Sequence, residues 1–321
     1  MGQSIPAGIP AIQTEGLTKY YGPHRGIEDL DLSVREGEIF GFLGPNGAGK
    51  TTTIRLLMDL IRPTRGRAVV FGKDSRADSV EIKRMVGYLP GEFALWNNLT
   101  GWQTLHYLGN LRGGVPPERI RETAERLQLD LGRKMREYSK GNKQKVGLVQ
   151  AFMHRPRLLV LDEPTASLDP LNQQEFFRMA EEARGWGATI FLSSHIMSEV
   201  EHVCDRVGIV REGHLVSVGS VSEVIAERHF HVEIKLDEPA PAALDEFAHL
   251  PEVSDVEVLD STLRFVVHGT IDSVVKHAAN HRVLSLTSHE PTLEEAFLEY
   301  YRHEGEEAAA EEPAEPALTG R

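Results

Sequence analysis

One glycine-rich segment constrains the fold of this chain more than any other feature. Residues 44–51 read Gly-Pro-Asn-Gly-Ala-Gly-Lys-Thr and match the pattern G-x-x-x-x-G-K-[ST]. A strand-like segment (38–43) precedes this loop and a helix-like segment (51–60) follows it, as the pattern requires. Glycines allow backbone N–H groups to turn inward around phosphate oxygens at the positive end of the following helix. We therefore predict a phosphate-binding loop in which Lys50 contacts the β and γ phosphates of a nucleotide and the Thr51 hydroxyl ligates Mg²⁺.

Two carboxylates follow a second apolar segment. Residues 158–161 are all apolar and are followed by Asp162 and Glu163, a pattern typical of a buried central strand that ends at a site. We predict that Asp162 holds Mg²⁺ through water and that Glu163 accepts a proton from the water that attacks the γ phosphate. The alternative is a solvated pair of surface carboxylates. The phosphate loop in the same chain favours the first interpretation.

The first two thirds of the chain have the pattern of an α/β fold. Short apolar runs alternate with helical stretches over residues 11–220, which predicts a mainly parallel sheet. The clearest segments are strands at 39–43, 158–161 and 189–192 and a helix at 173–184. Strand signals stop over residues 92–149, where the pattern predicts a helical insertion. Its expected helices cover residues 102–111, 117–127 and 142–153.

A second domain is predicted at residues 221–302. The order β-α-β-β-α-β indicates a small α+β ferredoxin-like domain. Its expected strands are 231–236, 253–259, 262–267 and 282–288, its helices are 242–249 and 271–280, and a closing amphipathic helix covers 292–302. Residues 303–321 hold six glutamates and two prolines with no lysine or arginine before Arg321, so we predict a disordered acidic tail.

Charge and hydropathy exclude several classes of protein. The 35 basic and 48 acidic residues give a net charge of −13, which argues against binding along a nucleic acid backbone. No run of 18 apolar residues occurs, and the first ten residues lack the pattern of a signal peptide. The lone Cys204 is compatible with a reducing cytosol. Any work at a membrane is therefore expected to need a partner.

Further motifs resemble those of a known family, the ATP-binding cassette (ABC) ATPases. Residues 138–145 (Tyr-Ser-Lys-Gly-Asn-Lys-Gln-Lys) resemble the family's signature segment, and residues 167–169 (Ser-Leu-Asp) resemble its D-loop. His195 falls where the family carries a switch histidine, and Tyr21 falls where an aromatic ring stacks on adenine. The resemblance covers about residues 11–220. It implies a P-loop NTPase core of the ABC ATPase type, with ATP and Mg²⁺ as cofactors.

The resemblance implies a role for each matching residue. Glu163 and His195 are expected to be catalytic, and Thr51 and Asp162 to hold the metal. The residues expected to bind ATP are Tyr21, Gly44, Pro45, Asn46, Gly47, Ala48, Gly49, Lys50, Thr51, Thr52, Ser139, Gly141, Asn142 and Asp169.

Plainer interpretations of several of these residues stay open. Tyr20 is an alternative to Tyr21 as the stacking ring, and both are also candidates for simple packing. His195 is otherwise a helix-capping histidine. Ser139 and Gly141 are otherwise an N-cap and a turn before a helix.

Two positions depart from the family pattern. Lys140 and Asn142 stand where the commonest signature has glycine and glutamine, and we expect function to survive this change. Gly91 stands where the family usually carries a glutamine, and Glu92 follows it. We expect a weakened contact rather than a replacement by Glu92, because a side chain one residue out of register points elsewhere on an extended chain.

The family's architecture implies two kinds of partner. ATP in this family lies between the phosphate loop of one subunit and the signature segment of another, so one copy of each motif implies a second copy of this chain. Separate integral membrane permease subunits are the other implied partner, which places the chain at the cytoplasmic face of the cell membrane. Phe93, Leu95, Trp96 and Trp102 are expected to form either a socket for a permease helix or the core of the insertion.

Finer sequence features resemble one branch of the family. They are Tyr-Leu-Pro at 88–90, Tyr-Ser-Lys-Gly at 138–141 and Pro-Thr-Leu-Glu-Glu-Ala-Phe-Leu at 291–298. This branch is the ATPase subunits of bacterial ABC-2-type exporters, which implies export of a drug, an antibiotic, a lipid or a polysaccharide. One alternative is a soluble ABC-type ATPase acting on ribosomes or DNA, which the single cassette and the acidic charge disfavour. A third interpretation makes the C-terminal domain a ligand-sensing regulator.

Overall fold

The computed structural model describes residues 9–92, 96–226, 230–237, 244–268 and 270–289. The chain divides into two compact units, Met1–Val221 and Ser222–Arg321, and each is described by itself. The predicted closing helix (292–302) and acidic tail (303–321) lie outside the described residues.

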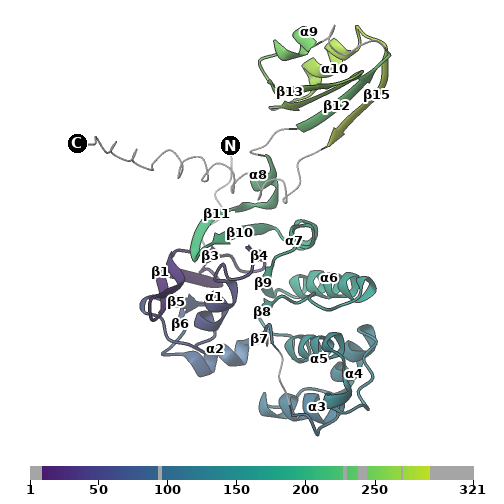
Figure 1. The fold of residues 1–321 in the computed structure, drawn as a ribbon. Helices are drawn as coiled ribbons and strands as arrows, with labels where there is room; N and C mark the ends of the chain where they lie inside the picture. Colours follow the sequence, from purple (N-terminus) through teal and green to yellow (C-terminus); the bar gives the residue numbers. More distant parts are fainter. Residues whose placement is uncertain (1–8, 93–95, 227–229, 238–243, 269, 290–321) are drawn as a thin grey trace, which may run out of the picture. The chain divides into compact units, whose positions relative to one another are not determined.

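A six-stranded sheet forms the centre of the first unit (Figure 1). Its strands lie in the order β11-β10-β4-β9-β8-β7, and every neighbouring pair is parallel except β10 and β11. The strands are β4 (Ile39–Leu43), β7 (Val86–Leu89), β8 (Leu158–Asp162), β9 (Thr189–Ser194), β10 (Arg206–Arg211) and β11 (His214–Ser220). All residues of β4, β8 and β9 are buried, which explains their continuous apolar runs. The α/β class is confirmed.

A second, antiparallel sheet was not predicted. Its strands lie in the order β2-β1-β5-β6, and β3 also pairs with β1. They are β1 (Ile12–Tyr21), β2 (His24–Leu30), β3 (Ser33–Val34), β5 (Arg65–Val70) and β6 (Lys73–Asp74). The register of β1 shifts between Glu15 and Thr18 on one side and between Leu17 and Lys19 on the other. Such irregularities break the alternation of polar and apolar residues by which a strand is recognised in a sequence.

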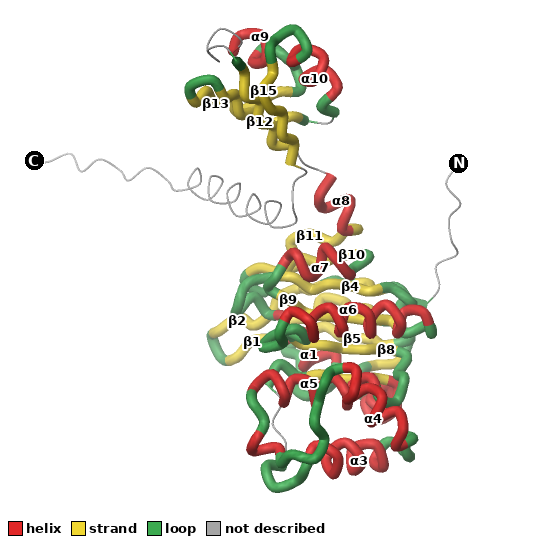
Figure 2. Tube along the Cα trace, turned by 90° about the vertical axis from the view of Figure 1, so that its right-hand side faces the viewer, coloured by secondary structure: helices red, strands yellow, loops and turns green. Residues whose placement is uncertain are grey.

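Helices cover both faces of the central sheet. On one face, Phe40 and Phe42 pack into a core shared with α1 (Lys50–Leu57) and with the antiparallel sheet. On the other face, a Cβ at Gly41 would lie 2.4 Å from the side chain of Val200, so α7 (Met197–Val203) rests directly on the strand. The long helix α6 (Pro170–Gly185) contacts β9 and lies across the sheet in Figure 2. A short helix, α2 (Ser79–Met85), leads into β7.

The predicted helical insertion forms one end of the first unit (Figures 1 and 2). It contains α3 (Gly101–Leu111), α4 (Pro117–Arg126), the 3₁₀ turn η1 (Met135–Glu137) and α5 (Lys140–Phe152). Thr100 and Gln103 form a reciprocal capping box that starts α3. Both α3 and α4 pack on α5, so the insertion is joined to the core through the helix that begins at Ser139.

The second unit contains a four-stranded antiparallel sheet with the order β13-β14-β12-β15. Its elements are β12 (Phe230–Leu236), α9 (Leu244–Ala248), β13 (Val253–Leu259), β14 (Thr262–Val267), α10 (Asp272–Ala278) and β15 (Val283–His289), after the short helix α8 (Val221–Ala226). Ile234, Phe247 and Phe265 lie in a hydrophobic core whose described members all belong to this unit.

Candidate active site

The glycine-rich loop lies between the end of β4 and the start of α1. Gly47 and Gly49 have φ angles of 84° and 111°, in the left-handed region that glycine adopts without strain. A Cβ at Gly49 would lie 2.7 Å from the carbonyl oxygen of Gly26, and one at Gly44 would lie 2.3 Å from that of Val210. The loop therefore requires glycine for both its dihedral angles and its close contacts with neighbouring strands.

Lys50 turns back beneath this loop. Its ammonium group donates to the carbonyl oxygens of Gly44 at 2.5 Å and Pro45 at 3.2 Å. The same nitrogen lies 3.3 Å from Oε1 of Glu163, and only 6% of the Lys50 side chain is exposed. A buried positive charge is thus fixed at the start of α1, where the helix dipole also favours an anion.

Thr51 and Asp162 come together from sequence positions 111 residues apart. The Thr51 hydroxyl donates to Oδ2 of Asp162 at 2.9 Å, and the Ser193 hydroxyl donates to Oδ1 at 2.7 Å. Asp162 is 1% exposed, so these two hydroxyls hold a carboxylate that water hardly reaches. Sequence reasoning missed Ser193, whose only signal is its place near the end of an apolar strand.

Glu163 directly follows β8 and is held in a left-handed conformation with φ 51°. Its backbone N–H donates to the Ser193 hydroxyl at 3.1 Å, and its Oε2 lies 2.8 Å from Nδ1 of His195. With Lys50 at its other oxygen, the carboxylate bridges a buried ammonium and an exposed imidazole. The structure therefore places the predicted Lys50, Thr51, Asp162, Glu163 and His195 at one edge of the sheet.

Glu199 lies beside this group, and sequence reasoning did not single it out. Its Oε2 accepts hydrogen bonds from the hydroxyls of Thr165 at 2.6 Å and Ser194 at 3.2 Å. Burial raises the pKa of the Glu199 carboxyl, while these two hydroxyls act in the opposite direction. No local sequence motif identifies Glu199, because its contacts form only when α7 packs against β9.

A cavity of about 310 Å³ opens over the loop. Tyr21, Arg25 and Glu163 line it together with the loop residues. Tyr21 is 44% exposed, and the Lys19 ammonium lies 5.2 Å from the centre of its ring. Tyr20 instead bonds to Glu28 through its hydroxyl, which raises the pKa of Tyr20. Tyr21 is therefore the tyrosine that faces the cavity.

The described residues that line this cavity do not include Ser139, Gly141, Asn142 or Asp169. The Ser139 hydroxyl accepts from the backbone N–H of Asn142 at 3.2 Å and caps α5, as the plainer interpretation expected. A Cβ at Gly141 would lie 2.5 Å from the carbonyl oxygen of Ser167, so the signature segment lies directly against the D-loop segment.

Asp169 caps α6 through Asn172, whose backbone and side-chain amides donate to it at 3.0 and 2.7 Å. These bonds lower the pKa of Asp169. Lys145 of α5 lies 3.9 Å from the same carboxylate. The starts of α5 and α6 are thus joined by polar contacts next to Glu163.

The segment that follows β7 contains the departure from the family pattern. Gly91 lies close to Asp162, since a Cβ there would be 3.0 Å from Oδ2 of that carboxylate, whereas Glu92 is exposed. Phe93 and Leu95 lie outside the described residues. Trp96 is 49% exposed and meets Tyr107 edge to face. Trp102 lies beneath the guanidinium of Arg121, at 4.5 Å.

Known proteins with similar sequences decide the family. The model of the ABC transporter family matches residues 27–166. Bacitracin transport ATP-binding protein BcrA of Bacillus licheniformis is 35% identical over 296 residues, which span 89% of this chain and 96% of BcrA. Linearmycin resistance ATP-binding protein LnrL of Bacillus subtilis (strain 168) is 31% identical over 304 residues, which span 89% and 97%. The chain belongs to the ABC transporter ATP-binding protein family.

Solved structures agree with this ABC ATPase assignment. An ATP-binding subunit of an ABC transporter is 30% identical with a TM-score of 0.61, over 67% of this chain and 91% of that one. The ATP-binding cassette MJ0796, solved as a dimer in a post-hydrolysis state with ADP and Pi, is 20% identical with a TM-score of 0.59, over 65% and 98%. It shows the same fold. No helix among the residues placed in the structure is long and apolar enough to cross a membrane.

Proposed function

We propose that this chain binds and hydrolyses ATP to drive transport through separate membrane subunits. The observation that carries the proposal is the arrangement of Lys50, Glu163 and His195 beside the phosphate loop. In the proposed state the Lys50 ammonium contacts the β and γ phosphates, and the loop amides hold the remaining phosphate oxygens. Tyr21 stacks on the adenine at the rim of the cavity.

The oxygen donors at this edge of the sheet suit a magnesium ion. The Thr51 hydroxyl and the Asp162 carboxylate meet at 2.9 Å, and hydroxyl and carboxylate oxygens are the ligands that Mg²⁺ prefers. We assign these two residues to hold it. When bound, Mg²⁺ neutralises charge on the β and γ phosphate oxygens.

Glu163 is the proposed general base for the attacking water. The Glu163 carboxylate oxygens lie near Lys50 and His195. When Glu163 accepts a proton, its ion pair with the Lys50 ammonium weakens, and the ammonium then faces the negative charge that develops on the phosphates. His195 is exposed and holds the Glu163 carboxylate through Nδ1. We propose that it also contacts the γ phosphate.

A second copy of the chain completes the site in this proposal. Ser139, Gly141 and Asn142 form the start of α5, where free N–H groups and the helix dipole favour an anion. These three residues are not among those found to line the cavity over the phosphate loop of the same chain. We therefore assign them to the γ phosphate that the partner's loop holds. Asp169 lies next to them and is proposed to contact the same nucleotide across the dimer.

Relatives support an export function at the cytoplasmic face of the membrane. BcrA and LnrL are named for bacitracin transport and linearmycin resistance, which favours an antibiotic or drug as cargo and disfavours the soluble alternative on ribosomes or DNA. Trp96 and Tyr107 give an exposed aromatic pair for a permease helix, whereas Trp102 is covered by Arg121.

The C-terminal unit is proposed to be ferredoxin-like, supported by its strand order and by its two helices. Residues 11–220 and 221–302 are the proposed domains.

The test compares wild type with Lys50→Ala after each is co-purified from membranes with its permease subunits. We expect ATP hydrolysis in lipid to fall by at least about 100-fold in the variant, because the phosphates lose their buried cation. Hydrolysis unchanged by this substitution would remove the proposal.

Closure of two copies is tested separately with Glu163→Gln. The variant should bind ATP and Mg²⁺ but hydrolyse about 100 to 10,000 times more slowly, so that dimers accumulate in sedimentation. A Glu163→Gln protein that stays monomeric with saturating ATP and its permease would contradict the proposed dimer.

A further inference from the structure

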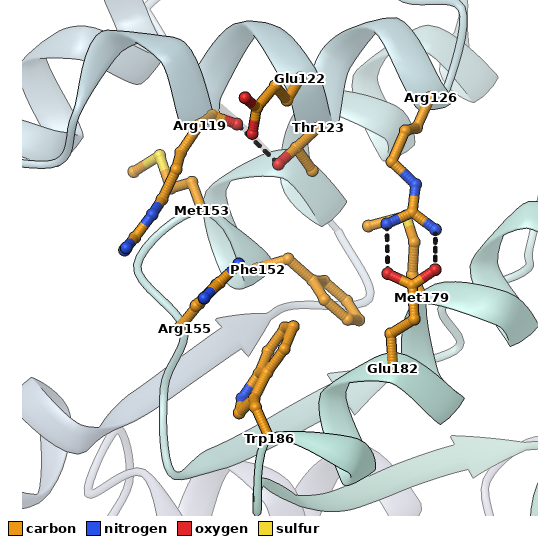
Figure 3. A pocket seen from close by; sticks show the side chains of 10 residues that line it. All are labelled: Arg119, Glu122, Thr123, Arg126, Phe152, Met153, Arg155, Met179, Glu182 and Trp186. Atoms are coloured by element: carbon orange, nitrogen blue, oxygen red, sulfur yellow. Dashed lines mark hydrogen bonds and ion pairs between the residues drawn. The ribbon is translucent and has the colours of Figure 1, made fainter.

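A second hollow lies away from the phosphate loop, where the helical insertion meets the core. Figure 3 shows its lining, which comes from α4, from the end of α5 and from the end of α6. Its volume is about 110 Å³. An enclosed cavity of about 150 Å³ holds benzene, and this smaller hollow opens to solvent beside Arg155 and Trp186, both exposed. There is room for a small ring whose substituent points outward.

The inner wall of the hollow is apolar. Phe152, Met153 and Met179 are each less than 5% exposed, and the Phe152 ring packs edge to face on Phe176 behind it. Trp186 stands at the rim with its ring directed toward Phe152 (Figure 3). Two aromatic rings and two thioether side chains form a surface suited to the face or edge of another ring.

Two arginines border the opening without a carboxylate partner. Arg119 of α4 makes no ion pair with any residue that the structure describes. Arg155 lies over the Trp186 ring, with its guanidinium carbon 5.4 Å from the ring centre, and no described carboxylate lies within ion-pair distance of it. Arg126, by contrast, is fully engaged with Glu182 on the opposite wall. Glu122 also lines the hollow, so Arg119 and Arg155 together with this one carboxylate leave the mouth with a net positive charge, on a chain of net charge −13.

We propose that this hollow binds a small aromatic acid. The ring lies against Phe152 and Trp186, and the carboxylate lies between the guanidinium groups of Arg119 and Arg155, which suit a planar anion. A neutral ring of the same size gains only the apolar contacts, and an aliphatic cation is repelled. The bound acid bridges α4, α5 and α6, so it joins the insertion to the core at a place distinct from the nucleotide cavity.

The test is calorimetric titration of the full-length protein with benzoate as the probe. We expect saturable binding with a dissociation constant of about 1 mM or tighter. The double variant Arg119→Gln/Arg155→Gln should bind at least about tenfold more weakly, because two charge-assisted hydrogen-bond donors are lost. Benzyl alcohol, a neutral ring of similar size, should bind wild type no better than benzoate binds this double variant.

Two further proteins make the result specific. Arg264→Gln/Arg282→Gln removes two exposed arginines from the second unit and should bind benzoate like wild type. Lys50→Ala should also bind it normally, since the nucleotide loop is not involved, and this separates the inference from the proposed function. Absence of saturable binding to wild type overturns the proposal, as does equal affinity in the Arg119→Gln/Arg155→Gln protein with an unchanged melting temperature. Loss of binding in Lys50→Ala would assign the benzoate to the phosphate loop and would equally overturn it.

Discussion

At the scale of single residues, the Glu163 carboxylate depends on contacts from elements far apart in the sequence. Its backbone is strained at φ 51°, and a conformation of that kind persists only when its surroundings hold it. Ser193 fixes its N–H, while the Gln144 side chain donates to the carbonyl oxygens of Glu163 at 2.9 Å and Pro164 at 3.1 Å. Gln144 lies on α5, two residues after Asn142, so the helix that begins at Ser139 helps to fix the position of Glu163, the proposed general base.

Gln144→Glu tests this positioning role. The carboxylate cannot donate to the two carbonyls and repels them instead, so we expect kcat for ATP hydrolysis to fall by about tenfold or more. Nucleotide affinity should stay within about twofold, because Gln144 is not among the residues identified along the cavity. Hydrolysis and nucleotide binding are measured on the same preparation.

Gln173→Glu is the matched control, since Gln173 also donates to a backbone carbonyl, that of Leu168, but does not contact Glu163. Equal losses of kcat in the two variants, or a loss of nucleotide affinity in Gln144→Glu, would show that Gln144 has no specific link to the base.

Residue patterns predicted one part of the site and not the other. Lys50, Thr51, Asp162 and Glu163 follow local motifs whose chemistry is tied to their spacing, so they are visible in a sequence. Ser193, Glu199 and Gln144 act through contacts between separate elements, and ordinary serine, glutamate and glutamine residues carry no local signal of such a contact.

At the scale of elements, Arg112 and His154 join the end of α3 to the end of α5 and the start of β7. Arg112 donates to the carbonyl oxygens of Lys83 and Val86 at 3.3 and 3.1 Å, and its Nη1 lies 3.0 Å from Nε2 of His154. Burial, with the nearby Arg112 charge, lowers the pKa of His154 to about 4. The histidine is therefore neutral in the folded protein at physiological pH.

A lowered histidine pKa makes stability depend on pH in a defined direction. The ordinary pKa of 6.5 applies to the unfolded chain, so below that value the unfolded state binds a proton that the folded state excludes until about pH 4. The contribution of neutral His154 to the free energy of unfolding is therefore present above pH 6.5 and is lost as the pH falls toward 4. Linkage gives a loss of about 2 kcal/mol between pH 7.5 and 5.

His154→Gln keeps an acceptor for Arg112 and removes the titration. We expect wild type to lose about 2 kcal/mol more than His154→Gln between pH 7.5 and 5, measured by urea unfolding. His24→Gln, which changes an exposed histidine, should follow wild type. Parallel pH profiles for wild type and His154→Gln would contradict the assignment.

A second junction between elements is ionic. Arg126 of α4 donates to Glu175 at 2.6 Å and to both oxygens of Glu182 at 2.6 and 2.8 Å, and both glutamates belong to α6. Glu175 is only 14% exposed. Bidentate geometry at Glu182 and partial burial at Glu175 make this three-residue contact stronger than an ordinary surface ion pair.

Arg126→Gln is expected to lower the free energy of unfolding by about 1 to 2 kcal/mol. Arg184→Gln is its control, because Arg184 also contacts two carboxylates, Glu181 and Asp205, but both are more than 40% exposed. That control should cost less than about 1 kcal/mol. If Arg184→Gln lowered the free energy of unfolding as much as Arg126→Gln does, the contact between α4 and α6 would be no stronger than an ordinary surface ion pair.

Elements with a regular pattern were predicted well, and irregular ones were not. The strands β4, β8 and β9 are buried along their whole length, so each appears as an unbroken apolar run. The helices of the insertion begin within about two residues of their expected starts, helped by caps such as Thr100. β1 escaped prediction because its register shifts on both sides, so that no simple periodicity survives.

At the scale of the whole molecule, the chain holds separate hydrophobic cores. The core of the first unit includes Phe42 and Phe191, and the members of that cluster come from residues 12–215. The core of the second includes Phe247 and Phe265, and its described members come from residues 230–283. Since burial of apolar surface is the main favourable term in folding, we expect the two units to unfold as separate cooperative transitions.

Matched cavities in the full-length chain test this independence. Phe265→Ala removes a ring that is 2% exposed and stacks on Phe247, so one calorimetric transition should lose about 3 to 5 kcal/mol. The other transition and the affinity for ATP should not change. Phe191→Ala, which removes a fully buried ring beside Phe40 and Phe42, should lower the other transition and weaken nucleotide binding. A single transition that both substitutions shift together would contradict this prediction and mean that the two cores fold as one cooperative unit.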